Sequence, residues 1–114
     1  MKNQPGKDVL EQIIQNWWLI REKIYQVAFQ ESLTYSAETE FLEAKGRVSR
    51  KLQPLIQELG NPQEIRDVVI RFMRRISSVN QMQQLPSADL RVLEKECHHI
   101  YIRLNRWYGE LDLN

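Results

Sequence analysis

The stretch QELGNPQEI, residues 57–65, divides the chain more sharply than any other and decides how the fold is interpreted. Glycine commonly ends a helix in a left-handed conformation, and Asn61 followed by Pro62 is typical of a helix start. Asparagine then caps the helix, and proline occupies its first position. The stretch therefore predicts a tight turn between one helix over 36–59 and another over 62–84.

Two further breaks lie on either side of this turn: the polar residues 32–36 and the sequence Leu85-Pro86-Ser87. They delimit helical patterns over about 8–31 and 87–108, with Ser36 and Ser87 as candidate N-caps. Short loops between helices of similar length favour antiparallel neighbours. We expect an all-α, up-down antiparallel four-helix bundle over residues 8–111 as a single domain. Residues 1–7 are expected to be a disordered N-terminal segment, and Pro54 predicts a kink in the second helix.

Composition agrees with one small domain. The chain has 114 residues, 42% of them hydrophobic, and its single cysteine cannot form an internal disulfide. No apolar stretch follows the basic start, and the longest apolar run is residues 17–20, far short of a membrane span. These features predict a cytoplasmic protein without membrane association.

Charge is distributed unevenly, although the net charge is only +1. Residues 1–44 carry four basic groups against seven acidic ones, residues 45–75 eight against three, and residues 76–114 four against five. Helical periodicity predicts that six bases of the middle segment form one basic surface for an acidic protein or for nucleic acid. These binding residues are Arg47, Arg50, Lys51, Arg71, Arg74 and Arg75.

Arg21 is the one charged residue in the middle of an apolar helix face, with Trp17 and Trp18 one turn before it. A charge at such a position needs a partner. We expect an ion pair with an acid of a facing helix, Glu94, together with stacking on tryptophan. A snorkelling arginine and a ligand-binding arginine are the alternatives.

The stretch EKECHHI, residues 94–100, concentrates two carboxylates, the only thiol and both histidines. At about 100° per residue, Cys97 turns into the core while Glu96 and His99 turn to the opposite face. Zinc and di-iron sites need more converging ligands than this helix provides. We therefore expect no metal and no cofactor.

Arg91, Glu94 and His98 do share one margin of the last helix. An arginine followed by a histidine at this spacing resembles the Arg-x(4–6)-His motif of the HEPN family, small helical-bundle proteins that include RNases. The resemblance implies a composite site at a dimer interface. In such a site, His98 would transfer a proton at the 2′-hydroxyl or the leaving group, and Arg91 would stabilise the negative charge of the phosphorane. The alternative is a polar ridge that pairs with Arg21 or with a second subunit.

Trp18 and Trp107 fall outside the centre of their apolar stripes and predict an interface, most simply that of a homodimer. The chain contains no Gly-rich loop, no cysteine pair and no nucleophile elbow. The sequence thus favours a non-catalytic helical binding, adaptor or regulatory module that acts through self-association and a basic face. Nucleic-acid binding and a HEPN-like or small-ligand enzyme are the alternatives.

Overall fold

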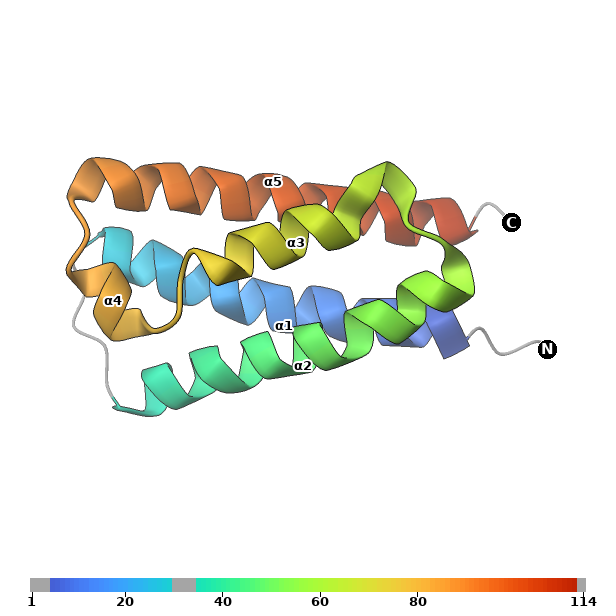
Figure 1. The fold of residues 1–114 in the computed structure, drawn as a ribbon, viewed down its shortest axis with the longest axis horizontal. Helices are drawn as coiled ribbons and strands as arrows, with labels where there is room; N and C mark the ends of the chain where they lie inside the picture. Colours follow the sequence, from blue (N-terminus) through green and yellow to red (C-terminus); the bar gives the residue numbers. More distant parts are fainter. Residues whose placement is uncertain (1–4, 30–34, 113–114) are drawn as a thin grey trace.

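The computed structural model describes residues 5–29 and 35–112, and their regular structure is entirely helical. The elements are α1 (Pro5–Ala28), α2 (Tyr35–Leu59), the 3₁₀ turn η1 (Pro62–Glu64), α3 (Ile65–Arg74), α4 (Val79–Gln83) and α5 (Ser87–Asp112) (Figure 1). The all-α prediction is confirmed. The four-helix bundle is not confirmed, because the described residues form five α-helices and the segment 62–84 contains two of them rather than one.

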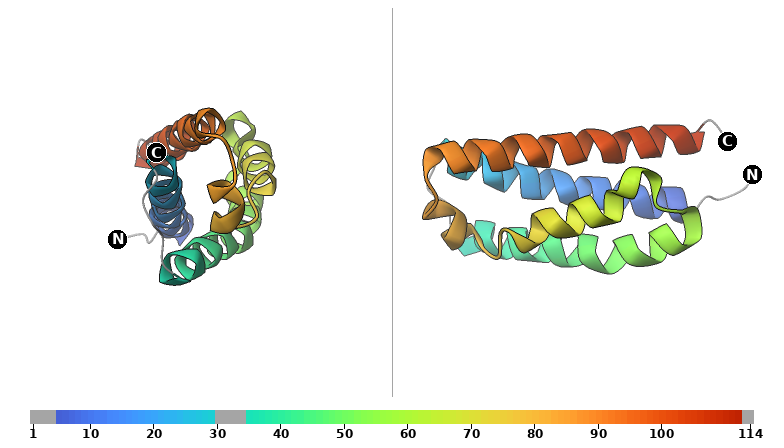
Figure 2. Two further views of the ribbon diagram at one scale, coloured as in Figure 1. Left: turned by 90° about the vertical axis from the view of Figure 1, so that its left-hand side faces the viewer. Right: turned by 45° about the horizontal axis from the view of Figure 1, so that its top comes forward.

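The four longer helices run along the long axis of a molecule that measures 47 × 25 × 19 Å, and they alternate in direction (Figure 1). Seen end-on, α1 lies between α2 and α5, and α3 closes the opposite side (Figure 2). The short helix α4 covers one end of the space that they enclose. None of the described helices has a stretch both long and apolar enough to cross a membrane.

Several helix boundaries differ from the predicted ones. α1 begins at Pro5, inside the segment predicted to be disordered, because proline is well accommodated in the first turn of a helix. Residues 1–4 of that segment, and residues 30–31 of the predicted first helix, lie outside the described ranges. α2 continues through Pro54, and α5 extends to Asp112 rather than 108.

The break between α3 and α4 was not predicted, and polar groups from α2 stabilise it. Ser78 caps α4, its hydroxyl accepting from the Gln81 backbone N–H at 3.1 Å. A carboxylate oxygen of Glu38 accepts from the Val79 N–H at 2.8 Å, and the ammonium group of Lys45 donates to the Ile76 carbonyl. Burial lowers the pKa of Lys45, and the Glu38 carboxylate opposes this shift. The backbone groups that the break releases therefore keep partners.

The reason for the break lies in the core. Val79 and Met82 are 2% and 0% exposed, so α4 closes one end of the apolar interior. A straight continuation of α3 would carry them past this end. The signal in the sequence was Ser78 followed by Gln81, a capping-box spacing inside the predicted helix.

Trp17 is fully buried and connects three helices. Its indole N–H donates to the Cys97 carbonyl of α5 at 3.0 Å. Its ring lies 5.5 Å from that of Phe72 on α3. Trp17 thus fixes the position of α1 against both α5 and α3.

The interface prediction for Trp107 is wrong, because Trp107 is only 4% exposed and belongs to the chain's own core. Tyr101 and Tyr108 of the same helix are only partly buried and lie at the margin of this core. α5 is thus rotated relative to the expected orientation. Tyrosine and tryptophan both suit either a core or a margin, so the pattern of one helix does not fix its rotation.

The predicted turn at residues 60–62 is present. Gly60 has a φ of +93°, and its N–H donates to the Ile56 carbonyl at 2.7 Å, which closes the end of α2. A side chain at this position would meet no atom within 4 Å, so only the backbone conformation requires glycine.

This geometry predicts opposite effects for two glycine substitutions. Gly60→Ala should lower the free energy of unfolding by about 1–2 kcal/mol, because alanine adopts a positive φ at a cost. Gly109→Ala, inside α5 and also without neighbours within 4 Å, should raise it by up to about 1 kcal/mol. Urea unfolding followed by circular dichroism measures both. Equal effects of the same sign would contradict the helix-ending role of Gly60.

Candidate functional site

The richest cluster of basic side chains lies on α3 and the neighbouring face of α5. α3 buries Ile65, Val69 and Phe72, and this spacing directs Arg71 and Arg74 to the opposite, solvent-exposed side. Both arginines lie in the last turn of α3, where cations interact favourably with the helix dipole. We use the term α3/α5 basic face for the exposed or half-buried residues Arg66, Arg71, Arg74, Arg75, His99 and Arg103.

A groove of about 300 Å³ runs between α3 and α5 within this face. Apolar side chains of Val68, Phe72 and Ile100 line it together with a charged rim of Arg71, Arg75, Glu96, His99 and Arg103. A second depression, of about 420 Å³, lies on α3 and shares two of these arginines. It is lined by Arg66, Asp67, Ile70, Arg71, Arg74 and Arg75. The basic residues therefore surround a partly apolar surface.

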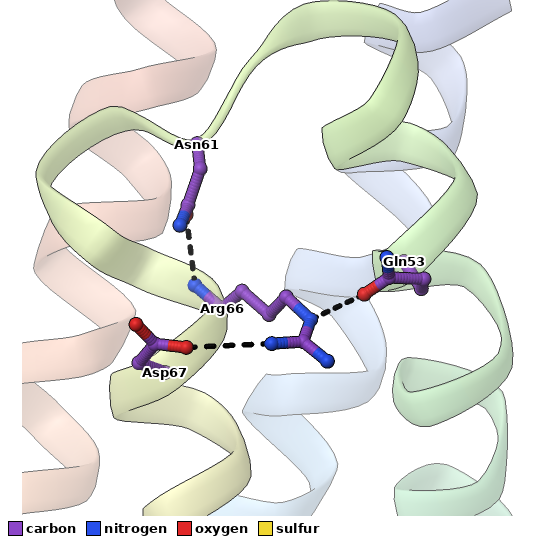
Figure 3. Close-up of polar contacts among 4 residues, drawn as sticks. All are labelled: Gln53, Asn61, Arg66 and Asp67. Carbon is purple, nitrogen blue, oxygen red and sulfur yellow. Dashed lines mark hydrogen bonds and ion pairs between the residues drawn. The ribbon is translucent and has the colours of Figure 1, made fainter.

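Two of the arginines are held in place by neighbours. Arg75 forms an ion pair with Glu96 of α5. The Arg66 guanidinium lies 3.4 Å from a carboxylate oxygen of Asp67 and donates to the Gln53 side chain of α2 (Figure 3). The Arg66 N–H donates to the Asn61 side chain at 3.1 Å, so Asn61 satisfies a backbone group at the start of α3.

Arg71 and Arg74 are different, because both are exposed and neither forms an ion pair within the described parts of the chain. Asp67 and Glu96, the acids that line the same two depressions, are paired with Arg66 and Arg75. Two cationic groups beside the groove thus have no ion-pair partner within the described residues.

The structure does not place all six predicted basic residues together. Arg47, Arg50 and Lys51 line a depression of about 660 Å³ between α2 and α1, not one on the α3 side. Arg47 donates to Asn16 at 3.3 Å, and Lys51 donates to Gln12 at 2.7 Å. The α3-facing side of α2 instead carries Ser49 and Gln53, which contact Met73 and Arg66. The prediction of one contiguous surface missed the rotation of α2.

The contacts between α1 and α2 follow one register. Lys51 pairs with Gln12, Arg47 with Asn16, and Lys23 with Glu40 at 2.8 Å. In each pair the two residue numbers add up to 63, which is expected when two antiparallel helices keep one constant register. Arg47 and Lys51 are therefore engaged in holding α1 against α2 rather than in a free basic patch.

Glu96, His99 and Arg103 of α5 complete the groove, and they were not among the predicted binding residues. Their spacing of three and four places them along one ridge of the helix, the side that faces α3. The spacing was visible in the sequence. The neighbouring helix that turns this ridge into the wall of a groove was not.

The predicted contact between Arg21 and Glu94 is present, with 3.8 Å between a guanidinium nitrogen and a carboxylate oxygen. The side chains are 20% and 23% exposed, so the pair is only partly buried. The Arg21 guanidinium also lies 5.0 Å from the centre of the Trp18 ring. Its Nε atom and the Nδ1 atom of His98 are buried without a hydrogen-bond partner among the described residues.

Arg91, Glu94 and His98, which were expected to form one polar ridge, have different surroundings in the structure. Glu94 contacts Arg21, His98 is half-buried, and Arg91 is exposed. No hydrogen bond or ion pair links Arg91 to His98 in the described part of the chain. The HEPN-like assignment of these residues stays a hypothesis.

Cys97 has no reactive character in this fold. The thiol is completely buried, and burial raises its pKa far above the usual range of a cysteine. The thiolate is the reactive form of cysteine. Within residues 5–29 and 35–112, no group of three or more His, Cys, Asp or Glu side chains is arranged to hold a metal ion.

Comparison with protein-family models, with curated proteins and with solved structures finds no match for this chain.

The ion pair predicts a measurable coupling. Arg21→Met and Glu94→Gln, alone and combined, form a double-mutant cycle, and the partly buried pair should show a coupling of about 0.5–1 kcal/mol in urea unfolding. Arg47→Met with Glu43→Gln, an exposed pair at 3.4 Å, is the control and should show less. A coupling of zero for Arg21 and Glu94 would show that their contact contributes nothing to stability.

Burial of Cys97 predicts slow thiol labelling. Maleimide should react at least about a hundredfold more slowly with the native protein than with the chain in concentrated guanidinium chloride. Because the buried thiol has to become exposed before it ionises and reacts, the native rate should stay below the denatured rate by a similar factor at pH 7 and at pH 9. Mass spectrometry follows the reaction. Equal rates in the two states would contradict the burial of Cys97.

Proposed function

We propose that this protein is a non-catalytic binding module that recognises an acidic segment of a partner protein through the α3/α5 basic face. The observation that carries the proposal is the position of Arg71 and Arg74. Both are exposed, neither has an acidic partner among the described residues, and Arg71 borders the groove containing Phe72 and Ile100.

The mixture of charge and apolar surface supports a protein ligand. Protein interfaces combine an apolar centre with a polar rim and are enriched in arginine. The groove has this composition, with Val68, Phe72 and Ile100 between Arg71, Arg75 and Arg103. An amphipathic acidic helix could place carboxylates on the rim and one apolar side chain in the centre.

Nucleic acid fits this face less well. α3 has ten residues and is therefore about 15 Å long. Its two arginines without ion pairs would neutralise about two phosphates, which gives weak binding with a shallow salt dependence. No exposed aromatic side chain belongs to the face, so it offers no stacking platform for bases.

Two broader expectations accompany the proposal. We regard the fold as a variant of the up-down four-helix bundle in which α3 and α4 together take the place of the third helix. We also place the protein in the cytoplasm, where a lone buried cysteine such as Cys97 is usual. Both stay proposals.

Fluorescence anisotropy with a labelled, Glu-rich amphipathic peptide containing central Leu residues tests the proposal. Arg71→Glu combined with Arg74→Glu should weaken binding at least about tenfold, because the groove rim then repels the peptide. Arg50→Glu combined with Lys51→Glu changes the net charge equally on another face and should alter affinity less than about twofold. Circular dichroism confirms that each variant stays helical.

Equal weakening by both double variants would show that net charge alone attracts the peptide, and would overturn the proposal. Labelled duplex DNA and single-stranded RNA are measured beside the peptide. Tighter binding to either nucleic acid, lost on the Arg71 and Arg74 changes, would replace the acidic protein ligand with nucleic acid. No binding to the peptide by the wild-type protein would also reject the proposal.

A further inference from the structure

A second surface, separate from the α3/α5 basic face, carries exposed aromatic side chains over α1 and α5. Trp18, Tyr25 and Phe29 are 44%, 45% and 62% exposed, and Ile102 of α5 is 41% exposed. The rings of Tyr25 and Phe29 lie 4.5 Å apart, and Trp18 lies 5.4 Å from the ring of Tyr101. We call these four residues, Trp18, Tyr25, Phe29 and Ile102, the α1/α5 aromatic face.

The charged residues that border this face differ in sign between the two helices. On α1 the border carries Glu11 and Glu22, and on α5 it carries Arg91 and Lys95. Arg91 and Lys95 are four residues apart, a spacing at which like charges repel on a helix. Within the described residues, no ion pair is formed by Arg91, Lys95 or Glu22.

Glu22 of α1 lies at the same level along the molecule as Arg91 and Lys95 of α5. Arg21 contacts Glu94, so the adjacent Glu22 is level with the segment of α5 that holds Arg91 and Lys95. α1 and α5 are antiparallel (Figure 1). An acidic edge and a basic edge therefore run beside each other on one surface, with the aromatic side chains between them.

From this arrangement we infer that the α1/α5 aromatic face binds a second copy of this chain. A two-fold axis parallel to the helices places α1 of one copy opposite α5 of the other at the same level. Glu22 then meets Arg91 and Lys95 of the second copy, and the aromatic side chains of both copies pack between these charges. A two-fold axis across the helices would instead oppose α1 to α1, and its acids would repel.

The exposed aromatic side chains supply part of the area that a dimer interface needs. A large aromatic side chain presents about 200 Å² when fully exposed, so the exposed parts of Trp18, Tyr25 and Phe29 amount to about 300 Å² per copy. A standard interface buries about 800 Å² per partner. Ile102 and the aliphatic parts of the bordering charged residues supply further area. The aromatic centre and charged rim also match the anatomy of protein interfaces.

Sedimentation velocity over about 1–100 µM protein, the range of a moderately tight dimer, tests this inference. The wild-type protein should sediment at twice its chain mass of 13.7 kDa. Tyr25→Ser combined with Phe29→Ser should leave a monomer. Leu42→Ser removes another exposed apolar side chain, 46% exposed on α2, and should leave the dimer unchanged.

Charge reversal tests the pairing of α1 with α5. Glu22→Lys alone and Lys95→Glu alone should each weaken the dimer at least about tenfold, because each change occurs twice in a two-fold assembly. Their combination should restore the affinity to within about threefold of wild type. Glu58→Lys, on α2, is the charge-matched control and should have no effect.

A wild-type monomer throughout this concentration range would overturn the inference. A dimer that survives the Tyr25 and Phe29 changes, or one that the combined charge reversal fails to restore, would also overturn it. The inference is independent of the proposed acidic ligand, because the Arg71 and Arg74 variants should remain dimeric whether or not they bind the acidic peptide.

Discussion

The burial of Trp17 is the constraint on which the rest of the structure depends. Its side chain reaches two helices at once, through a hydrogen bond of 3.0 Å to the Cys97 carbonyl of α5 and through contact with the Phe72 ring of α3. A buried indole N–H without a partner would be costly, so α5 is fixed in both height and rotation relative to α1. This position brings Arg21 to Glu94 one turn further along and leaves Trp18 at the surface.

The position of α5 determines both surfaces that matter for function. On one side of α5, the ridge of Glu96, His99 and Arg103 meets α3 and forms the groove of the α3/α5 basic face. On the other side, α5 and α1 together expose the aromatic side chains and the two charged borders. In our two proposals, one of these surfaces binds an acidic ligand and the other binds a second copy of the chain. Because the surfaces lie on opposite sides of α5, both can be occupied at the same time in this scheme.

Much of the local structure followed from the sequence. The turn at Gly60 was predicted because a left-handed glycine leaves a strong local signal, but α3 begins at Ile65 with Glu64 rather than Asn61 as its N-cap. The Arg21 and Glu94 contact was predicted because a charge within an apolar helix face needs a partner on a facing helix. The break at Ser78 was missed, although Ser78 and Gln81 carry a capping spacing, because the apolar periodicity continues across it through Ile76 and Val79. Groups about forty and thirty residues earlier stabilise the break, because Glu38 accepts from the Val79 N–H and Lys45 donates to the Ile76 carbonyl.

The sequence by itself determined that the described residues are helical, that a turn follows residue 59, and which face of each long helix is apolar, because these properties depend on neighbours within a few residues. Only the tertiary structure decided how far each helix is rotated about its axis. That rotation buried Trp107, turned Arg47 and Lys51 toward α1, and separated them from Arg71 and Arg74. The physical reason is that side chains at the edge of an apolar stripe suit either the core or the surface. Packing against the other helices selects between the two.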